Sequence, residues 1–328
     1  MGLCYGTGPV IAIAANGDNF EKRSIEETVM FSTFPFRDLV RRWAMVCSVV
    51  FLLAVALPAP MGAQQQPRPN LRVLFIGNSY TFTNNLGDVV AGIAAAQKDG
   101  PTITPTIVAR GGTHLEWHLK NGPAMSSLQA GRWDYVILQE FSTLGGEIGK
   151  PEVGDPEPFY ASVRQWVPKI RAVGATPILL MTWARRGAKE AESKKLFDAF
   201  GHIASELDVK VAPAGLAWAE AHRRLRTLDL HIYDESHPTE AGSYLTALVI
   251  YATLTGQNPG GTAATIYGHP VETGGGGAGF GAGAMPTAVP DMTLTVPLVE
   301  LGPATAAELQ RVAWDTVSRQ TEPAHPTH

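Results

Sequence analysis

Two short stretches of the sequence carry residue types that can perform nucleophilic chemistry. Ser79 follows the apolar run VLFI at 73–76 and a two-residue turn, and Asp234 lies three positions before His237. A serine hydroxyl is a weak nucleophile until a base removes its proton, and a histidine base works best when a carboxylate orients it. If the fold brings Ser79, Asp234 and His237 together, the chain has the residues that acyl transfer needs.

Each stretch also has a simpler explanation. A Gly-Asn-Ser sequence after a strand often forms nothing more than a turn. Asp234 and His237 can act as capping residues ahead of the helix that we predict at 239–255. Their order along the chain, and their positions on loops beside predicted strands and helices, favour the functional interpretation.

Attack on a carbonyl also needs hydrogen-bond donors where negative charge develops. Gly111 and Gly112 follow the second predicted strand, and a glycine backbone lets an N–H group approach a ligand closely. Gln139 follows the third strand, and its side-chain amide can donate a hydrogen bond. The alternatives are that the glycines only permit a turn, and that Gln139 and Glu140 only satisfy loop amides.

The elements that must position these residues are predicted from apolar runs and helical periodicity. Short apolar runs bounded by turn residues are typical of parallel strands buried on both faces. We expect strands at 71–77, 103–109, 134–138, 176–182 and 209–212, and helices at 86–98, 157–173, 188–207, 215–226 and 239–255. This alternation predicts an α/β domain with a mostly parallel five-stranded sheet between helices. Pro168 is expected to kink or divide the second helix.

In open α/β sheets, ligands bind outside the carboxyl ends of the strands, where the strand order reverses. If the order is 2-1-3-4-5, this reversal lies between the first and third strands. Ser79, Gly112 and Gln139 would then flank one crevice.

Taken together, these blocks resemble a known family. The Gly-Asn-Ser block at 77–79, the glycine after strand two, the polar residues after strand three and the Asp-x-x-His block at 234–237 are similar to the motifs of the SGNH (GDSL-type) hydrolase superfamily. The resemblance covers roughly 71–256. It implies a three-layer, flavodoxin-like α/β/α domain that hydrolyses esters, often acetyl groups on carbohydrates, and needs neither a metal nor an organic cofactor.

The same resemblance implies a role for each block. Ser79 would be the nucleophile, His237 the base and Asp234 the acid that orients it. The backbone amides of Ser79 and Gly112 would donate hydrogen bonds to the oxyanion.

Two positions depart from the family pattern. Asn78 stands where the usual motif has Asp, and Gln139 stands where it has the Asn that donates to the oxyanion, so we expect Gln139 to take over that donation. The candidates for lining a substrate pocket are the neighbours of these blocks, namely Asn78, Tyr80, Glu140 and Trp183. For Trp183, a place in the apolar core is an equal alternative.

His114, Glu116 and His118 are potential metal ligands that lie close together in the sequence. Three such residues without a known ligand spacing are more simply the solvated face of a helix. We therefore predict no metal site.

Composition and charge limit the class of protein. The 328 residues are 45% hydrophobic and 17% charged, which suits one large globular domain with appendages. The net charge of −4 gives no overall basic field, so nucleic acid and anionic membrane surfaces are not expected partners. Both cysteines precede residue 64, so the predicted domain has neither disulfide nor thiol chemistry.

Residues 30–63 have the features of an export signal. Basic residues lead into a charge-free apolar stretch at 44–57 and then into the small Gly-Ala pair at 62–63. The stretch is shorter than the roughly 20 residues that a membrane span needs, and an uncleaved anchor and a core helix are the alternatives. We expect a secreted or periplasmic protein with no stable membrane span after cleavage. We also expect that residues 1–29 are an N-terminal extension that results from assigning the start codon too early.

The chain beyond the domain falls into three parts. Residues 257–302 are rich in Gly, Pro, Ala and Thr and are predicted to be a loop or linker. A capping box, Thr305-x-x-Glu308, predicts a helix at 303–319 that packs back on the domain. Residues 320–328 are predicted to be a disordered tail.

The predicted function is that of an exported serine esterase acting on a small-molecule or glycan ester, with an acetylated carbohydrate as the first candidate. Two alternatives stay open. One is a lipid esterase or thioesterase of the same fold, and the other is a non-catalytic carbohydrate-binding module.

Overall fold

The structure is a computed structural model that describes residues 68–146, 150–272 and 289–321. The predicted extension at 1–29, the predicted export signal at 30–63 and most of the predicted tail lie outside the described residues.

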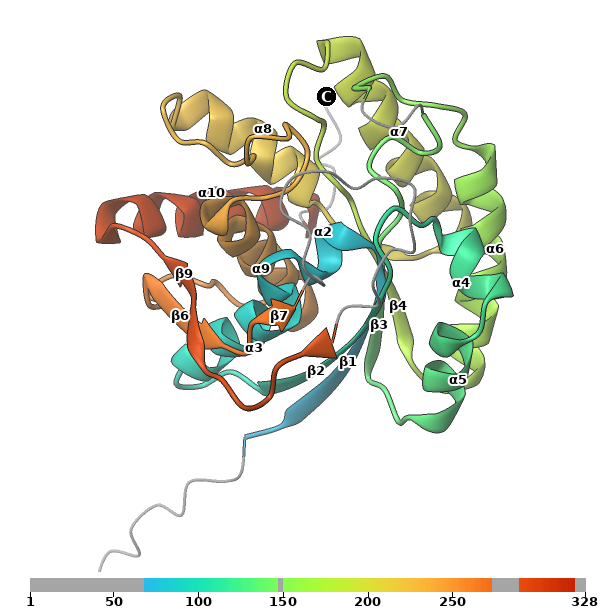
Figure 1. The fold of residues 1–328 in the computed structure, drawn as a ribbon, viewed down its shortest axis with the longest axis horizontal. Helices are drawn as coiled ribbons and strands as arrows, with labels where there is room; N and C mark the ends of the chain where they lie inside the picture. Colours follow the sequence, from blue (N-terminus) through green and yellow to red (C-terminus); the bar gives the residue numbers. More distant parts are fainter. Residues whose placement is uncertain (1–67, 147–149, 273–288, 322–328) are drawn as a thin grey trace, which may run out of the picture. The chain divides into compact units, whose positions relative to one another are not determined.

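A five-stranded parallel sheet forms the centre of the domain (Figure 1). Its strands are β1 (Asn70–Gly77), β2 (Thr102–Ala109), β3 (Tyr135–Leu138), β4 (Thr176–Leu180) and β5 (Lys210–Ala212). They are ordered β2-β1-β3-β4-β5, and every neighbouring pair is parallel. The predicted α/β fold with its five-stranded sheet is therefore confirmed, and the strand order reverses beside β1.

The alternation of side chains along β1 gives the sheet two apolar faces. Val73 and Phe75 belong to one buried cluster, while Leu74 and Ile76 belong to another. Successive residues of a strand point to opposite faces, so an unbroken apolar run requires cover on both. The first cluster is completed by α3 (Leu86–Ala96), α8 (Ala214–Arg224), α9 (Glu240–Thr255) and α10 (Pro303–Thr321), and the second by α5 (Pro123–Ala130), α6 (Glu157–Ala172) and α7 (Glu190–Leu207). Figure 1 shows the two groups of helices on opposite sides of the sheet.

Helix α9 is buried on all sides. Every residue from Ala241 to Leu254 is buried, because α3, α8 and α10 all pack against it. A helix that is apolar all round is stable only in such an environment. On the other face of the sheet, α6 continues through Pro168 without being divided.

Part of the segment predicted as a loop or linker at 257–302 pairs into strands. Strand β6 (Thr265–Gly268) is antiparallel to β9 (Val296–Glu300), and β7 (Val271–Glu272) to β8 (Val289–Pro290). Ile266 and Val299 are buried in the cluster that contains α3 and α9. The few apolar residues of this segment thus anchor it to the domain. They are hard to recognise as strand residues in the sequence, because Gly and Pro dominate the segment around them.

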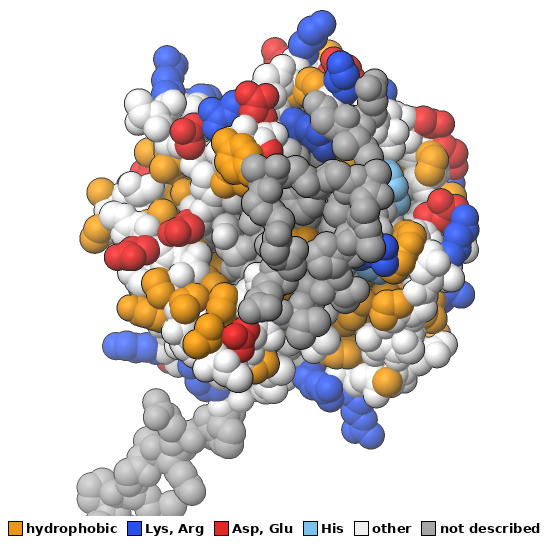
Figure 2. Space-filling model, in the orientation of Figure 1, with side chains coloured by type: hydrophobic (Ala, Val, Ile, Leu, Met, Phe, Trp, Pro, Cys, Tyr) orange, Lys and Arg blue, Asp and Glu red, His pale blue; other side chains and the backbone are white. Residues whose placement is uncertain are grey.

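Helix α10 follows this segment and returns to the domain. Its apolar stripe at Leu309, Val312 and Ala313 is buried, and the helix packs on α9 and α8. No helix within the described ranges is both long and apolar enough to cross a membrane. Acidic and basic side chains are interspersed on the face shown in Figure 2, without one large patch of a single sign.

Candidate active site

The turn after β1 presents Ser79 at the carboxyl edge of the sheet. Helix α2 (Ser79–Phe82) begins directly after Asn78, whose Oδ1 accepts a hydrogen bond from the N–H of Tyr80 at 3.1 Å. Gly77 leaves no room for a side chain, because a Cβ there would lie 2.4 Å from the Thr81 Oγ1. The glycine is thus required by close packing, and the Asn78 side chain caps the helix that carries the serine.

The structure brings the three predicted residues Ser79, His237 and Asp234 together. The Oγ of Ser79 lies 2.7 Å from Nε2 of His237, across a separation of 158 positions in the sequence. Nδ1 of His237 pairs with Oδ2 of Asp234. The other oxygen, Oδ1, accepts the backbone N–H groups of Ser236 at 3.0 Å and His237 at 2.9 Å.

The electrostatics of Asp234 suit a carboxylate that orients a base. Burial raises the pKa of Asp234, but hydrogen bonds from the His237 backbone and side chain and from the Ser236 N–H outweigh it, so the pKa lies below its ordinary value. An ionised Asp234 accepts the Nδ1–H of His237. Nε2 is then left with a lone pair that can accept the proton of the Ser79 hydroxyl.

Aromatic residues support the loop that carries Asp234 and His237. The hydroxyl of Tyr80 lies 2.6 Å from Oγ of Ser236, and Nε1 of Trp183 donates to the Ser236 carbonyl at 3.0 Å. Tyr80 and Trp183 are 4% and 1% exposed. The structure therefore places both of these pocket candidates against the loop, and their contact with a substrate stays a prediction.

The predicted oxyanion donors lie on two neighbouring turns. Gly112 has a φ of 67°, a conformation that favours glycine, and it is exposed in the turn after β2. Nδ2 of Asn78 donates to the Thr113 carbonyl at 3.0 Å. This contact ties the turn that contains Gly112 to the turn that contains Ser79.

The side-chain oxygen of Gln139, and not its amide nitrogen, points toward the turn that carries Ser79. Its Oε1 accepts the N–H of Asn78 and the hydroxyl of Thr81, each at 2.8 Å, while its Nε2 donates to the Glu140 carbonyl. Donation from Gln139 to an oxyanion stays a prediction that uses the second hydrogen of Nε2. The contact with the Asn78 N–H fits the alternative in which Gln139 satisfies a loop amide, and the Thr81 hydroxyl is a further partner that sequence reasoning did not name.

Glu140 is a buried anchor of the loop that precedes α4 (Leu115–Lys120). Its carboxylate accepts Nδ1 of His114 at 2.9 Å, the N–H of Leu115 at 3.1 Å and the N–H of Phe141 at 2.6 Å. The hydrogen bond to Glu140 raises the pKa of His114 above its ordinary value, although partial burial opposes this. These partners account for the Glu140 carboxylate, and its predicted place in a substrate pocket stays untested.

The expectation that His118 lies on a solvated helix face is wrong. His118 is 1% exposed, and its Nε2 lies 2.7 Å from the Gly77 carbonyl oxygen. Glu116, by contrast, is exposed and pairs with Lys120. Helix α4 has only six residues, so the sequence carries no periodic signal that could have shown the burial of His118. Over the described ranges, no group of three or more His, Cys, Asp or Glu side chains is arranged to hold a metal ion.

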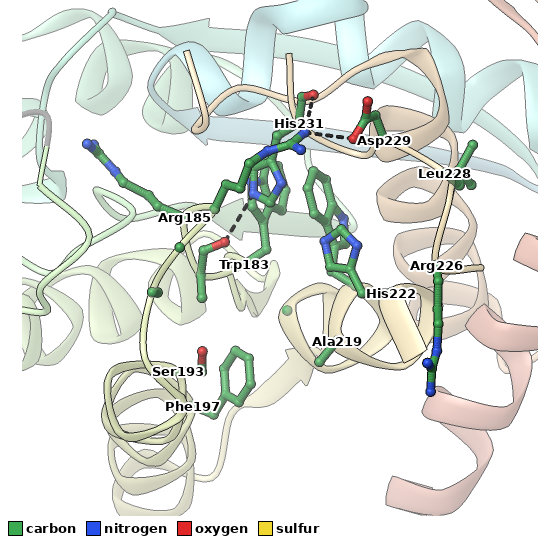
Figure 3. A pocket seen from close by; sticks show the side chains of 16 residues that line it. Trp183, Arg185, Ser193, Phe197, Ala219, His222, Arg226, Leu228, Asp229 and His231 are labelled. Atoms are coloured by element: carbon green, nitrogen blue, oxygen red, sulfur yellow. Dashed lines mark hydrogen bonds and ion pairs between the residues drawn. The ribbon is translucent and has the colours of Figure 1, made fainter. Parts of the chain in front are cut away.

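A cavity of about 340 Å³ lies behind the loop, between the end of β4, α7 and α8 (Figure 3). Trp183 forms part of its lining together with Trp218, and His231 donates from Nε2 to the Ala184 carbonyl at 3.1 Å. Burial lowers the pKa of His231 to about 4, so this imidazole is neutral at pH 7. Nη2 of Arg186 donates to Oδ1 of Asp229 at 2.9 Å and to the His231 carbonyl at 3.2 Å, which fixes the start of the loop.

Comparison with known proteins finds no match to the sequence, but it finds solved structures that are similar to this one. No family model matches the chain, and no curated protein sequence does. A DUF4886 family protein from Bacteroides uniformis matches 78% of this chain and 98% of its own, with 19% identity and a TM-score of 0.52.

Two further solved structures match over a smaller share of the chain. A protein from Slackia heliotrinireducens described as a candidate SGNH hydrolase has 25% identity and a TM-score of 0.45 over 56% of this chain and 99% of its own. The psychrotrophic esterase EstA from Pseudoalteromonas has 14% identity and a TM-score of 0.42 over 56% of this chain and 96% of its own. The likeness to the Bacteroides uniformis protein shows that the two chains share a fold.

Proposed function

We propose that the protein is a serine esterase in which Ser79 attacks the carbonyl carbon of an ester. The observation that carries this proposal is the continuous hydrogen-bonded line from the Ser79 Oγ through His237 to Asp234, with 2.7 Å between Oγ and Nε2. Nucleophile, base and orienting carboxylate need this order and spacing. A turn or a helix cap alone would not require it.

The reaction proceeds in two halves. His237 takes the proton of Ser79 as Oγ bonds to the carbonyl carbon, and returns it to the alcohol as that leaving group departs. Water then repeats the sequence on the acyl-enzyme and releases the acid. Asp234 holds the imidazole tautomer and stabilises its charged form throughout.

The tetrahedral intermediate needs donors for its oxyanion. We assign the backbone N–H groups of Ser79 and Gly112, with Gln139 as a third donor through its second Nε2 hydrogen. Within the described part of the chain, neither backbone N–H donates to another protein group. The contact from Asn78 to the Thr113 carbonyl supports this assignment, because it joins the two turns that carry these amides.

The substrate class rests on the motif resemblance alone. That resemblance favours acyl esters of carbohydrates, with acetyl as the acyl group, and the apolar stretch at 44–57 favours export to the periplasm or beyond. A lipid esterase or thioesterase uses the same three residues. A panel of acetylated sugars and of aryl esters with short and long acyl chains separates these alternatives by their relative kcat/KM values.

An organophosphonate is the direct test of the nucleophile, because it forms a stable phosphonyl ester with an activated serine. Mass spectrometry of the treated protein should place the adduct on Ser79, and Ser79→Ala should abolish it. Ser126→Ala is the matched control, since Ser126 is an exposed serine on α5. Absence of any adduct at high reagent concentration would overturn the proposal and favour the non-catalytic binding module.

A further inference from the structure

The peptide bond between Gly77 and Asn78, just before the serine, is held at both ends. Its carbonyl accepts Nε2 of His118 at 2.7 Å and the N–H of Arg110 at 3.1 Å. Its N–H donates to Oε1 of Gln139 at 2.8 Å. Because these partners come from α4, from the residue after β2 and from the residue after β3, three separate elements fix one peptide plane.

His118 makes its contact as a neutral imidazole with one defined tautomer. A carbonyl oxygen only accepts, so Nε2 carries the hydrogen. Burial lowers the pKa of His118, although the bond to Gly77 and the charge of Glu140 oppose this. Nδ1 is buried and has no hydrogen-bond partner among the described residues. An unpartnered buried nitrogen costs free energy, which an apolar side chain at this position would avoid.

We infer that His118 is a positioning residue for the nucleophile, an inference that rests on the proposed esterase function. Through the Gly77 carbonyl it sets the plane of the peptide from which α2 starts, and hence the directions of the Ser79 hydroxyl and N–H. An apolar side chain would avoid the cost of the unpartnered Nδ1, but it would not supply the donor that holds this carbonyl while Gln139 holds the N–H of the same peptide.

The groups around His118 limit what its ionisation can do. Oγ1 of Thr113 lies 3.5 Å from Nε2, the Trp117 ring meets the imidazole edge-on, and the charges of Arg110 and Glu140 act in opposite directions on its pKa. Protonation at Nδ1 would leave the Nε2–H donor in place. His118 should therefore affect the rate of the chemical step without adding an ionisation to the pH profile.

Two variants separate the donor from the bulk of the side chain. In His118→Gln the amide nitrogen can occupy the position of Nε2, whereas in His118→Asn it reaches only the position of Nδ1. We expect His118→Gln to keep kcat for 4-nitrophenyl acetate within about 3-fold of wild type. His118→Asn should lose about 10- to 100-fold in kcat and in the rate of phosphonate labelling, with KM within about 2-fold, because misplacing a nucleophile costs rate more than binding.

A matched control removes a comparable hydrogen bond that α6 makes to α4, the helix that carries His118. Nε1 of Trp166 donates to the Leu115 carbonyl at 3.2 Å and makes no hydrogen bond to the nucleophile turn. Trp166→Phe should lower the melting temperature about as much as His118→Asn while leaving kcat unchanged.

Three results would overturn the inference. They are equal kcat values for the Gln and Asn variants, a loss of kcat in Trp166→Phe as large as in His118→Asn, and failure of both His118 variants to fold, which would make the role purely structural. Failure of the esterase proposal looks different, since wild-type protein would then neither turn over an ester nor become labelled on Ser79.

Discussion

Tyr80 lies flat against Trp183, with ring centroids 4.5 Å apart and planes 2° from parallel, and the Tyr80 hydroxyl lies 2.6 Å from Oγ of Ser236. Tyr80 is the neighbour of Ser79 in the chain, and Ser236 is the neighbour of His237. The turn that carries Ser79 and the loop that carries His237 are therefore joined one residue away from the atoms that would react. This contact limits how far the serine and the histidine can move relative to each other.

Removing the Tyr80 hydroxyl should loosen this joint without disturbing the stack. Tyr80→Phe should lower the free energy of unfolding by about 1 kcal/mol, the usual contribution of one hydrogen bond, and lower kcat several-fold. Tyr251→Phe is the control, because the hydroxyl of Tyr251, on α9, donates to Oε1 of Gln257 just beyond the end of that helix, away from the site. Urea unfolding and ester turnover measure both effects, and equal kcat values for the two variants would show that the joint has no part in catalysis.

The three residues of the site should act as one unit. Ser79→Ala and His237→Ala should each lower kcat/KM for 4-nitrophenyl acetate by about 10⁴-fold or more, and Asp234→Asn by about 10³- to 10⁴-fold, as in other triads. Combining two of the substitutions should cost little more than one, because the remaining group has nothing left to assist. Retention of more than about a tenth of the wild-type value in either alanine variant would contradict the assigned roles.

The buried His231 should make stability depend on pH in a defined window. Its pKa of about 4 in the folded protein lies below the ordinary 6.5, because burial disfavours the charged form. Between pH 6.5 and about 4, this imidazole is protonated in the unfolded chain but neutral in the folded protein. The contribution of His231 to the free energy of unfolding is therefore fully present above pH 6.5 and is lost as the pH falls towards 4. The loss is at most about 3 kcal/mol.

The measurement is the free energy of unfolding in urea between pH 4 and pH 7. His222 also has a lowered pKa through burial and acts in the same direction, whereas the contribution of Asp234, whose pKa is lowered from 3.8, is lost only at still lower pH. His231→Gln should flatten the curve, and His202→Gln, at an exposed position, should not. An unchanged slope in His231→Gln would show that His231 is not the proton-linked group.

The central sheet could be predicted from the sequence because its signals are local and repeated. The run at 73–76 is apolar at every position, which only cover on both faces explains. That Ser79 would meet Asp234 and His237 was predicted from the order of the blocks and from their resemblance to known motifs, because Asp234 and His237 lie on the loop between α8 and α9 and not at the end of a strand. Strands β6 and β9 were missed because their few apolar residues lie in a segment dominated by Gly and Pro.

Other features of the site depend on contacts that a sequence does not display. The orientation of the Gln139 amide follows from the Asn78 N–H, in the turn after β1, and from the Thr81 hydroxyl, on α2. His118 lies on a helix of six residues, too short for a periodic pattern to show which face is buried. Gln139 was expected near the site and His118 on a solvated helix face, and in both cases the hydrogen-bond partner was set by tertiary packing.

Gly77 offers the sharpest test of how closely the nucleophile turn is packed. In Gly77→Ala the new Cβ would lie 2.4 Å from the Thr81 Oγ1 and 2.5 Å from the Gln139 Oε1. Neither atom can retreat freely, because Gln139 holds both the Thr81 hydroxyl and the Asn78 N–H. The variant should lose about 1–3 kcal/mol of stability, and kcat should fall at least about 10-fold because the serine shifts.

Gly201→Ala in α7 is the matched control, since nothing lies within 4 Å of its new Cβ. It should gain about 0.5–1 kcal/mol from the better helix propensity of alanine and keep full activity. If Gly77→Ala were as stable and active as Gly201→Ala, the close packing that orients Ser79 would be absent in solution.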